Sequence, residues 1–444
     1  MNVIKINKDF NRLSLDTNTK NENIGIDHLE KIYTFSKTGK NVIVIDLDMG
    51  ISGYIPYIFE EKPELLNSFS GFTYYPNTIS FGRVTIFGSP GIFGGYEYAP
   101  LEMKKRNTES YLRKLEESIL MLPRIFSNRG YRTTLNDLQF AIDSAFAEYP
   151  EITVKKTHGK YLDYYYSQHN DLKVSDSVIK IKSNLIRFNF FKFSPLILRS
   201  FVYDGGEYLT YGTTYSLPAY TLDWYSQLYF LPEISTFQDK PENTFSILIN
   251  EITHQPVAFF ETPDYTPVSI VSNRGNGPFA NEDFYHVNMA ALLLLGKWFD
   301  FLKENDVYDN TRIIIVSDHG TNLHSAFPGN IILPDKRPLQ WYQPILLVKD
   351  FNQKHSLLTD DTFMTNADVP VLATDGLISN PVNPFTGNAI TAEKENGVTI
   401  TTAIQLKAMK NLQKNHGSVK KDEWMHVHDN IFDINNWKQV EVTE

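Results

Sequence analysis

Three strongly apolar runs of the chain end in side chains that can do chemistry. The run NVIVIDLD carries Asp46 and Asp48 at its end, TFSILINE leads to His254, and RIIIVS continues into Asp318 and His319. Short apolar runs of this kind are typical of buried parallel strands, and ligands of such sheets bind beyond the carboxyl ends of the strands. One buried acid there is explained as a helix cap. Three strand ends that carry Asp or His together predict a functional site.

The sharpest local signal is the tripeptide Asp318-His319-Gly320. A carboxylate oxygen beside an imidazole nitrogen offers the ligand types that Zn²⁺ or Mn²⁺ takes. Gly320 lets the backbone turn tightly past an ion. The alternative is a strand-end aspartate that caps a helix, with a surface histidine beside it. The position directly after a buried strand favours the metal site.

Thr85 lies in the loop sequence GRVTIFGSP. A threonine hydroxyl is a weak nucleophile that needs a base or a metal ion to activate it. A loop that leads into a helix also offers backbone N–H groups to a phosphate. The alternative is an N-cap threonine, and one residue can serve both purposes. The glycines that follow match neither nucleotide-binding motif and predict a flexible active-site loop.

The histidines and one arginine supply the remaining candidates. His254 is expected to hold a substrate oxygen or to act as an acid or base, with a buried core histidine as the alternative. Arg83, His286 and His324 are further substrate-binding candidates.

Composition excludes several other classes of site and partner. The 444 residues carry 42 Lys and Arg against 52 Asp and Glu, a net charge of −10, so we expect no nucleic-acid partner. Cysteine is absent, which removes disulfides, thiolate metal ligands and a cysteine nucleophile. Aromatic residues reach 14%, which suits carbohydrate, glycerol or lipid contacts, although core packing accounts for most of them.

Strands and helices alternate along the chain, which predicts an α/β fold with a mostly parallel central sheet flanked by helices. We expect strands at 41–48, 72–80, 244–251, 312–317 and 344–349, and helices at 107–128 and 281–303. No apolar run approaches the roughly 20 residues of a membrane-spanning helix, and the N-terminus lacks an apolar signal core.

The expected domain organisation has three parts. Residues 1–25 form a polar lead-in, and residues 26–390 form the catalytic domain. Within that domain, residues 138–240 are rich in Tyr and Phe and are interpreted as an insertion or a cap. Residues 391–444 form a smaller C-terminal subdomain with a helix near 403–413.

Taken in order, these motifs resemble the sulfatase branch of the alkaline phosphatase superfamily. The similar segments are NVIVIDLD, GRVTIFGSP, FSNRGYRTT, THQP, YDNTRIIIVSDHG, DVPVLAT and NPFTG. The resemblance spans about residues 40–390, with 140–240 poorly matched. It implies the same α/β fold.

The position of the nucleophile separates the members of this superfamily. Arylsulfatases modify a Cys or Ser in a Cys/Ser-x-Pro-x-Arg motif that this chain lacks, so sulfate-ester hydrolysis is disfavoured. Thr85 falls where lipoteichoic acid synthases and lipid A phosphoethanolamine transferases have their threonine. The resemblance to those enzymes implies one divalent ion, Zn²⁺ or Mn²⁺, held by Asp48, Thr85, Asp318 and His319. It also implies that His254 binds substrate.

Two departures from these relatives refine the expectation. Asp48 stands where they have Glu, so Asp46 on the same face of the strand is our second choice of ligand. Phosphoethanolamine transferases carry disulfides and a further histidine well after the Asp-His-Gly motif. Here cysteine is absent, and His324 lies much closer to that motif. These differences favour the phosphoglycerol-type enzymes.

The resemblance implies a phosphotransferase that moves a phospholipid head group to a cell-envelope glycan or glycolipid through a phospho-threonine. It also implies an extracytoplasmic location, as the soluble domain of a membrane-anchored protein, with the membrane contact made by a region absent from this chain. The alternatives are a phosphodiesterase or phosphatase of the same superfamily, and a non-catalytic regulator that keeps the fold.

Overall fold

The computed structural model describes residues 29–137, 146–157, 159–169, 172, 189, 191–203, 219–255, 260–268, 270–323, 330–405 and 419–442. In these residues, eight strands form a central sheet in the order β13-β3-β12-β11-β2-β8-β5-β6. The strands are β13 (Leu358–Thr359), β3 (Phe72–Tyr74), β12 (Leu346–Lys349), β11 (Thr311–Val316), β2 (Asn41–Leu47), β8 (Thr244–Asn250), β5 (Arg132–Asn136) and β6 (Ile152–Lys155).

The three apolar runs that precede the predicted site residues are neighbours in this sheet. Strand β2 pairs in parallel with β11 on one side and with β8 on the other. Strands β5 and β6 continue the parallel part, whereas β12 runs antiparallel to both β11 and β3. The predicted α/β fold with a mostly parallel sheet is confirmed. Because β11, β2 and β8 are parallel neighbours, their carboxyl ends lie side by side at the same end of the sheet.

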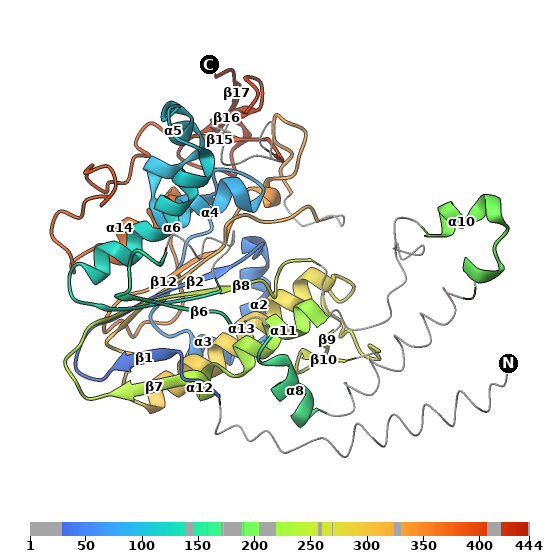
Figure 1. Cartoon of the computed structure of the whole chain (residues 1–444), viewed down its shortest axis with the longest axis horizontal. Coiled ribbons are helices and arrows are strands. Elements are labelled where there is room, and N and C mark those ends of the chain that lie inside the picture. The colour runs from blue at the N-terminus through green and yellow to red at the C-terminus, as the bar shows by residue number, and fades with distance from the viewer. Residues whose placement is uncertain are drawn as a thin grey trace.

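Helices cover both faces of the sheet (Figure 1). Along β2, Val42 and Val44 pack into one apolar cluster and Ile43 and Ile45 into another, so the strand is buried on both sides. This explains its continuous apolar sequence. The first face is covered by α4 (Thr85–Gly94), α6 (Tyr111–Ser127) and α14 (Val369–Thr374), and the second by α2 (Ile55–Glu61), α3 (Leu65–Ser68), α11 (Ala219–Tyr229), α12 (Leu231–Ile234) and α13 (Asp283–Glu304).

One predicted strand is interrupted. The segment 72–80 forms β3 and, after a break that includes Pro76, the short strand β4 (Thr78–Ile79), which pairs with β14 (Met364–Thr365) in a separate sheet. Proline has no backbone N–H to donate to a strand ladder, which is consistent with the break. The prediction of one continuous strand over 72–80 is therefore wrong.

Part of the region interpreted as an insertion or cap is integral to the body. Strand β6 pairs in parallel with β5 at one edge of the central sheet. Strand β7 (Ser235–Gln238) pairs in parallel with β1 (Tyr33–Ser36). Residues of α11 lie in the same apolar cluster as α13. Helices α8 (Leu162–Gln168) and α10 (Leu196–Tyr203) also belong to this region.

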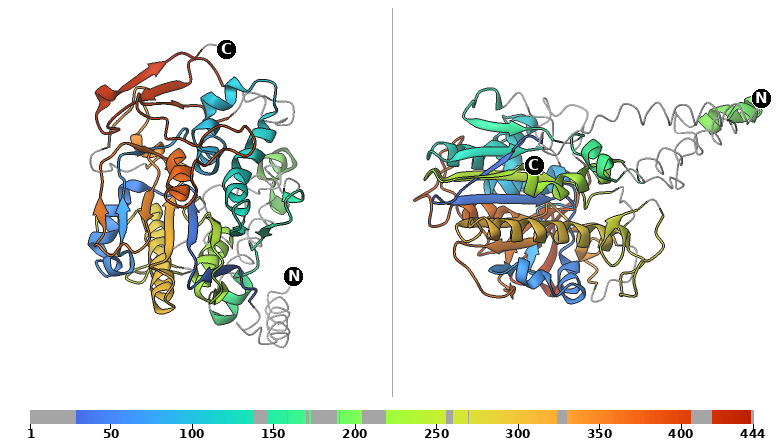
Figure 2. Two further views of the ribbon diagram at one scale, coloured as in Figure 1. Left: turned by 90° about the vertical axis from the view of Figure 1, so that its left-hand side faces the viewer. Right: turned by 90° about the horizontal axis from the view of Figure 1, so that it is seen from below.

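The C-terminal residues add a small antiparallel sheet, drawn in red at the top of the left view in Figure 2. It consists of β15 (Val398–Thr401), β16 (Trp424–Val427) and β17 (Trp437–Val440).

The polar lead-in lies outside the described part of the chain, as does the expected helix near 403–413 apart from its first three residues. The remaining elements are α5 (Pro100–Lys105), β9 (Phe260–Glu261) and β10 (Thr266–Pro267). Where the structure is described, no helix combines the length and apolarity that crossing a membrane requires.

Candidate active site

Thr85 is the first residue of helix α4, and Val84 is the N-cap residue, with an extended backbone and no side-chain cap bond. The structure therefore does not use Thr85 as the N-cap. Its hydroxyl instead lies beside the Asp48 carboxylate at the end of β2, where burial raises the pKa of that carboxyl and the donor character of the hydroxyl lowers it. The first N–H groups of a helix have no intrahelical acceptor and carry partial positive charge. The Thr85 hydroxyl thus lies at a helix end that suits an anionic group.

Asp48, Asp318 and His319 come together at the joined ends of β2 and β11. Each offers a ligand atom, these atoms all lie within 4.8 Å of one another, and all three residues are buried. Asp318 Oδ1 accepts hydrogen bonds from the Met49 N–H at 3.1 Å and the His319 N–H at 2.8 Å. Asp318 Oδ2 is buried and has no hydrogen-bond partner in the described structure, and His319 Nε2 lies 3.4 Å from it. A carboxylate oxygen and an imidazole nitrogen this close, without a hydrogen bond between them, fit two ligands of one ion.

The imidazole of His319 is held in the orientation that a metal ligand requires. Its Nδ1 lies 2.6 Å from the Gly320 carbonyl oxygen, and a proton on Nδ1 leaves the Nε2 lone pair for an ion. A Cβ on Gly320 would lie 1.9 Å from the Gln340 carbonyl oxygen, so only glycine allows this turn. The residues present therefore fit one divalent cation.

Carboxyl groups are concentrated around this site. Burial raises the pKa of Asp48 and of Asp46 well above the usual range, and the nearby Asp318 raises both further. Glu251, directly after β8, also has a pKa raised by burial. Neither oxygen of Asp46 has a hydrogen-bond partner among the described residues. Asp46 is nevertheless outside the group of ligand atoms, which contains Asp48, our first choice.

The site opens into a cavity of about 620 Å³. Thr85, His319, Arg83 and His254 line it together with the apolar or aromatic side chains of Met49, Val84, Ile86, Phe284, Trp341 and Ile404. The Arg83 guanidinium lies 4.3 Å from the centre of the Trp341 ring, and its Nε donates to the Thr402 carbonyl oxygen at 3.0 Å. The cavity therefore combines an apolar wall with cationic and hydroxyl groups.

Of the predicted histidines, His254 lies at the cavity and His286 does not. His254 lines the cavity, with its Nδ1 2.6 Å from the Gln255 carbonyl oxygen. His286 is buried in α13, where its ring nitrogens lie 3.3 and 3.0 Å from the carbonyl oxygens of Phe260 and Ala280. It is not among the residues that line the cavity. Its ring is thus engaged by backbone groups, as in a structural histidine. His324 lies outside the described residues.

Two residues hold α4 against the end of β11. The sequence predicts a flexible active-site loop for the glycines of this segment, but the structure places Gly88 in the helix α4, so that prediction is wrong. A Cβ on Gly88 would lie 2.2 Å from the Asp318 carbonyl oxygen, so glycine allows α4 to approach the end of β11. The Asn366 Nδ2 donates to the carbonyl oxygens of Gly88 at 3.0 Å and Asp318 at 3.1 Å. No local signal identifies Asn366, because both of its partners are distant in sequence.

We predict that Gly88→Ala destabilises the protein by about 1–3 kcal/mol, because the added methyl group overpacks the contact with the Asp318 backbone. Gly91→Ala is the matched control in the same helix, since its Cβ would find its nearest neighbour at 3.4 Å. The control is expected to be neutral or up to ~1 kcal/mol more stable. Urea unfolding measures both changes, and equal stability of the two variants would contradict the predicted contact.

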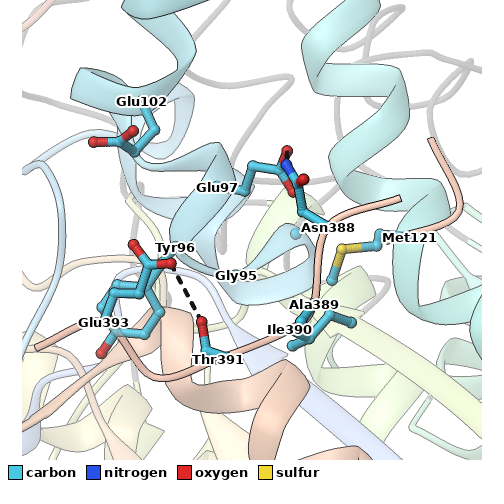
Figure 3. A pocket seen from close by; sticks show the side chains of 11 residues that line it. Gly95, Tyr96, Glu97, Glu102, Met121, Asn388, Ala389, Ile390, Thr391 and Glu393 are labelled. Atoms are coloured by element: carbon cyan, nitrogen blue, oxygen red, sulfur yellow. Dashed lines mark hydrogen bonds between the residues drawn. The ribbon is translucent and has the colours of Figure 1, made fainter. Parts of the chain in front are cut away.

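A second pocket lies near the other end of α4 (Figure 3). It presents Glu97, Glu102 and Glu393, and the Thr391 hydroxyl donates to Glu393 at 3.2 Å. The Glu97 carboxylate accepts hydrogen bonds from the side chains of Asn383, Thr386 and Asn388. Glu97 therefore fixes a surface loop, and none of the predicted site residues reaches this pocket.

No protein-family model matches the chain, and no curated protein does. Solved structures that it resembles include an alkaline phosphatase superfamily protein from Vibrio parahaemolyticus, at 14% identity over 94% of this chain and 86% of that chain, with a TM-score of 0.45. The lipoteichoic acid synthase LtaP from Listeria monocytogenes matches at 10% identity, 91% and 89% coverage, and a TM-score of 0.44.

The C-terminal periplasmic domain of EcEptC from Escherichia coli, solved in complex with Zn, matches at 12% identity over 86% of this chain and 94% of that chain, with a TM-score of 0.42. The Vibrio parahaemolyticus protein is described as a member of the alkaline phosphatase superfamily, which the motifs of this sequence resemble. At such identities and scores, none of these structures assigns a substrate to the chain.

Proposed function

We propose that this protein is a metal-dependent phosphotransferase of the alkaline phosphatase type, which moves a phospholipid-derived head group to a glycan or glycolipid of the cell envelope. The observation that carries the proposal is the position of Thr85, beside Asp48 of the Asp48, Asp318 and His319 ligand group and at the wall of a cavity that His319 also lines. This arrangement supports a nucleophile, a proton acceptor and cation ligands at a single site.

In the first step, Thr85 Oγ1 attacks the phosphorus of the donor phosphodiester. A bond from phosphorus to Oγ1 forms and the bond to the diacylglycerol oxygen breaks. The hydroxyl proton moves to the adjacent Asp48, and the leaving diacylglycerol oxygen takes a proton from His254. In the second step, an acceptor hydroxyl gives its proton to His254 and attacks the phospho-threonine; the bond from phosphorus to Oγ1 breaks, and Thr85 takes back the proton from Asp48.

A bound Zn²⁺ or Mn²⁺ would be held by Asp48, Asp318 and His319 beside Thr85, and would supply Lewis-acid stabilisation of charge on the phosphoryl oxygens. The N–H groups at the start of α4 add hydrogen-bond donors for the same oxygens. The apolar wall of Phe284, Trp341 and Ile404 suits the lipid part of a donor. A phospholipid donor requires that the enzyme act at a membrane, which we propose to be its extracytoplasmic face.

Product analysis with and without an acceptor tests the transferase assignment. The metal-loaded protein is incubated with vesicles of phosphatidylglycerol or phosphatidylethanolamine, with or without a glycolipid acceptor, and the products are separated by mass spectrometry. Transfer requires diacylglycerol in amounts equal to those of the modified acceptor. Diacylglycerol with only free head-group phosphate, at the same rate in both reactions, would support the phosphodiesterase alternative instead. No product with either donor would favour the non-catalytic alternative.

Arg83 is expected to bind the anionic group of the substrate. Arg83→Gln should raise KM about 10–100-fold, because a charge-assisted hydrogen bond contributes about 1.5–3 kcal/mol. Arg337→Gln is the matched control, since its guanidinium also lies near the Trp341 ring, at 5.6 Å, but Arg337 does not line the cavity. Steady-state kinetics on a soluble phosphodiester measure both variants. An equal rise of KM in both would contradict the role of Arg83.

A further inference from the structure

Helix α10 (Leu196–Tyr203) and the turn before it expose an unusual amount of apolar surface. Phe193 is 82% exposed, Leu196 83% and Phe201 68%. Five of the thirteen large hydrophobic side chains that are exposed in the described structure lie between residues 193 and 203. Figure 1 shows α10 apart from the central sheet and the helices that cover it. A concentration of exposed apolar side chains marks an interaction surface.

The exposed side chains do not share one face of the helix. Successive helical residues turn by about 100°, so Leu196 and Leu198 point to nearly opposite sides. Both are exposed, as are Phe201 and Tyr203. Val202, by contrast, is only 3% exposed, so one side of the helix is covered. The exposed apolar and aromatic side chains remain available to the boundary of a lipid layer.

The charges of the same segment complement an anionic surface. No acidic residue occurs from position 177 to position 203, in a chain whose net charge is −10. Within residues 191–203 the basic residues are Lys192 and Arg199, and the sequence just before them adds Lys180, Lys182 and Arg187. A sequence that combines basic residues with aromatic residues and leucines, without acidic ones, is typical of segments that bind anionic lipid.

Arg199 of α10 is hydrogen-bonded to the turn that precedes the helix. Its Nε donates to the Ser194 carbonyl oxygen at 3.2 Å and its Nη2 to the Lys192 carbonyl oxygen at 3.3 Å. Its guanidinium also lies 5.9 Å from the centre of the Phe191 ring. These contacts tie the turn to the helix, and the side chains of Phe193 and Leu196 remain exposed.

We propose that residues 191–203 are a membrane-docking element that inserts into the surface of an anionic lipid bilayer. The contact with the membrane is then made by this chain itself, in addition to any region outside it. This inference does not depend on the reaction at Thr85. It assigns a role to α10 and the turn before it, which belong to the 138–240 region but are not part of the central sheet.

Vesicle flotation of the full chain tests the proposal. Wild type is compared with Phe193→Ser/Leu196→Ser/Phe201→Ser on vesicles of phosphatidylglycerol and phosphatidylcholine, and on phosphatidylcholine alone. We expect binding to the anionic vesicles, weakened by salt at about 0.5 M, and at least about tenfold weaker binding of the triple variant. The control Ile270→Ser/Leu358→Ser/Val382→Ser removes apolar side chains that are exposed elsewhere and should bind as wild type does.

Wild type that binds no vesicle, binds neutral vesicles equally well, or binds no better than the triple variant would overturn the proposal. So would a dimer in sedimentation velocity that the triple variant abolishes, because the surface would then serve a second copy of the chain. Circular dichroism should show the same unfolding temperature for wild type and both variants. Any turnover of a soluble phosphodiester should be unchanged in both, so a failure of the proposed reaction leaves this test intact.

Discussion

Replacing Thr85 with alanine is expected to lower turnover at least about 10³-fold while leaving the fold intact, because the variant lacks the atom that forms the covalent intermediate. The Thr85 side chain is half-buried at the start of α4 and makes no capping bond, so alanine loses only the contact of the hydroxyl with Asp48, at a cost of about 1 kcal/mol. Steady-state turnover of a phosphodiester measures the loss, and circular dichroism and metal content verify the folded protein.

Thr85→Ser is the matched control for this prediction. Serine keeps a hydroxyl at the same position beside Asp48, so substantial activity should return. If alanine and serine variants were equally active, at the wild-type level, Thr85 would not be the nucleophile. If both were equally inactive, the threonine methyl group rather than the hydroxyl would be the essential feature.

Replacing Asp318 with asparagine is expected to have opposite effects on stability with and without metal. In the metal-free protein the variant should be about 1–3 kcal/mol more stable, because the buried Asp318 carboxylate, which faces the acids Asp48 and Asp46, becomes neutral. The asparagine oxygen can still accept from the N–H groups of Met49 and His319. Metal should stabilise wild type by about 2.7 kcal/mol at a free concentration roughly 100-fold above Kd, but not the variant.

Thermal unfolding with a chelator, and then with added Zn²⁺ or Mn²⁺, measures both effects. Asp375→Asn, at the end of α14 and outside the ligand group, is the control and should behave as wild type does in both conditions. A metal-dependent stabilisation of equal size in wild type and Asp318→Asn would contradict the proposed site.

The strands that deliver the site residues could be predicted because they are buried on both faces. Strands β2, β8 and β11 have continuous apolar sequences, and the polar residues at their ends stand out against these runs. The grouping of Asp48 with Asp318 and His319 follows from the parallel pairing of β2 with β11. Local sequence and strand pairing together therefore account for the ligand group.

The remaining features depend on contacts that no local pattern encodes. Asn366 is joined to Gly88 and Asp318 only by the fold. Strand β6 is short and only its first residue is buried, so its four residues have no continuous apolar pattern to identify them. The burial of His286 among backbone carbonyl groups depends on the packing of α13 against β9. Such features require the tertiary structure.

The central claim, that Thr85 forms a covalent intermediate, is tested most directly by peptide mass spectrometry. The metal-loaded protein is incubated with a phosphatidylglycerol or phosphatidylethanolamine donor without acceptor, quenched in acid and digested with trypsin. Cleavage after Arg83 and Lys104 gives a peptide that begins at Val84 and contains both Thr85 and Ser89. We predict a head-group phosphate adduct that fragmentation assigns to Thr85, and that is absent from the Thr85→Ala protein. An adduct on Ser89, or turnover without any adduct on this peptide, would contradict the account.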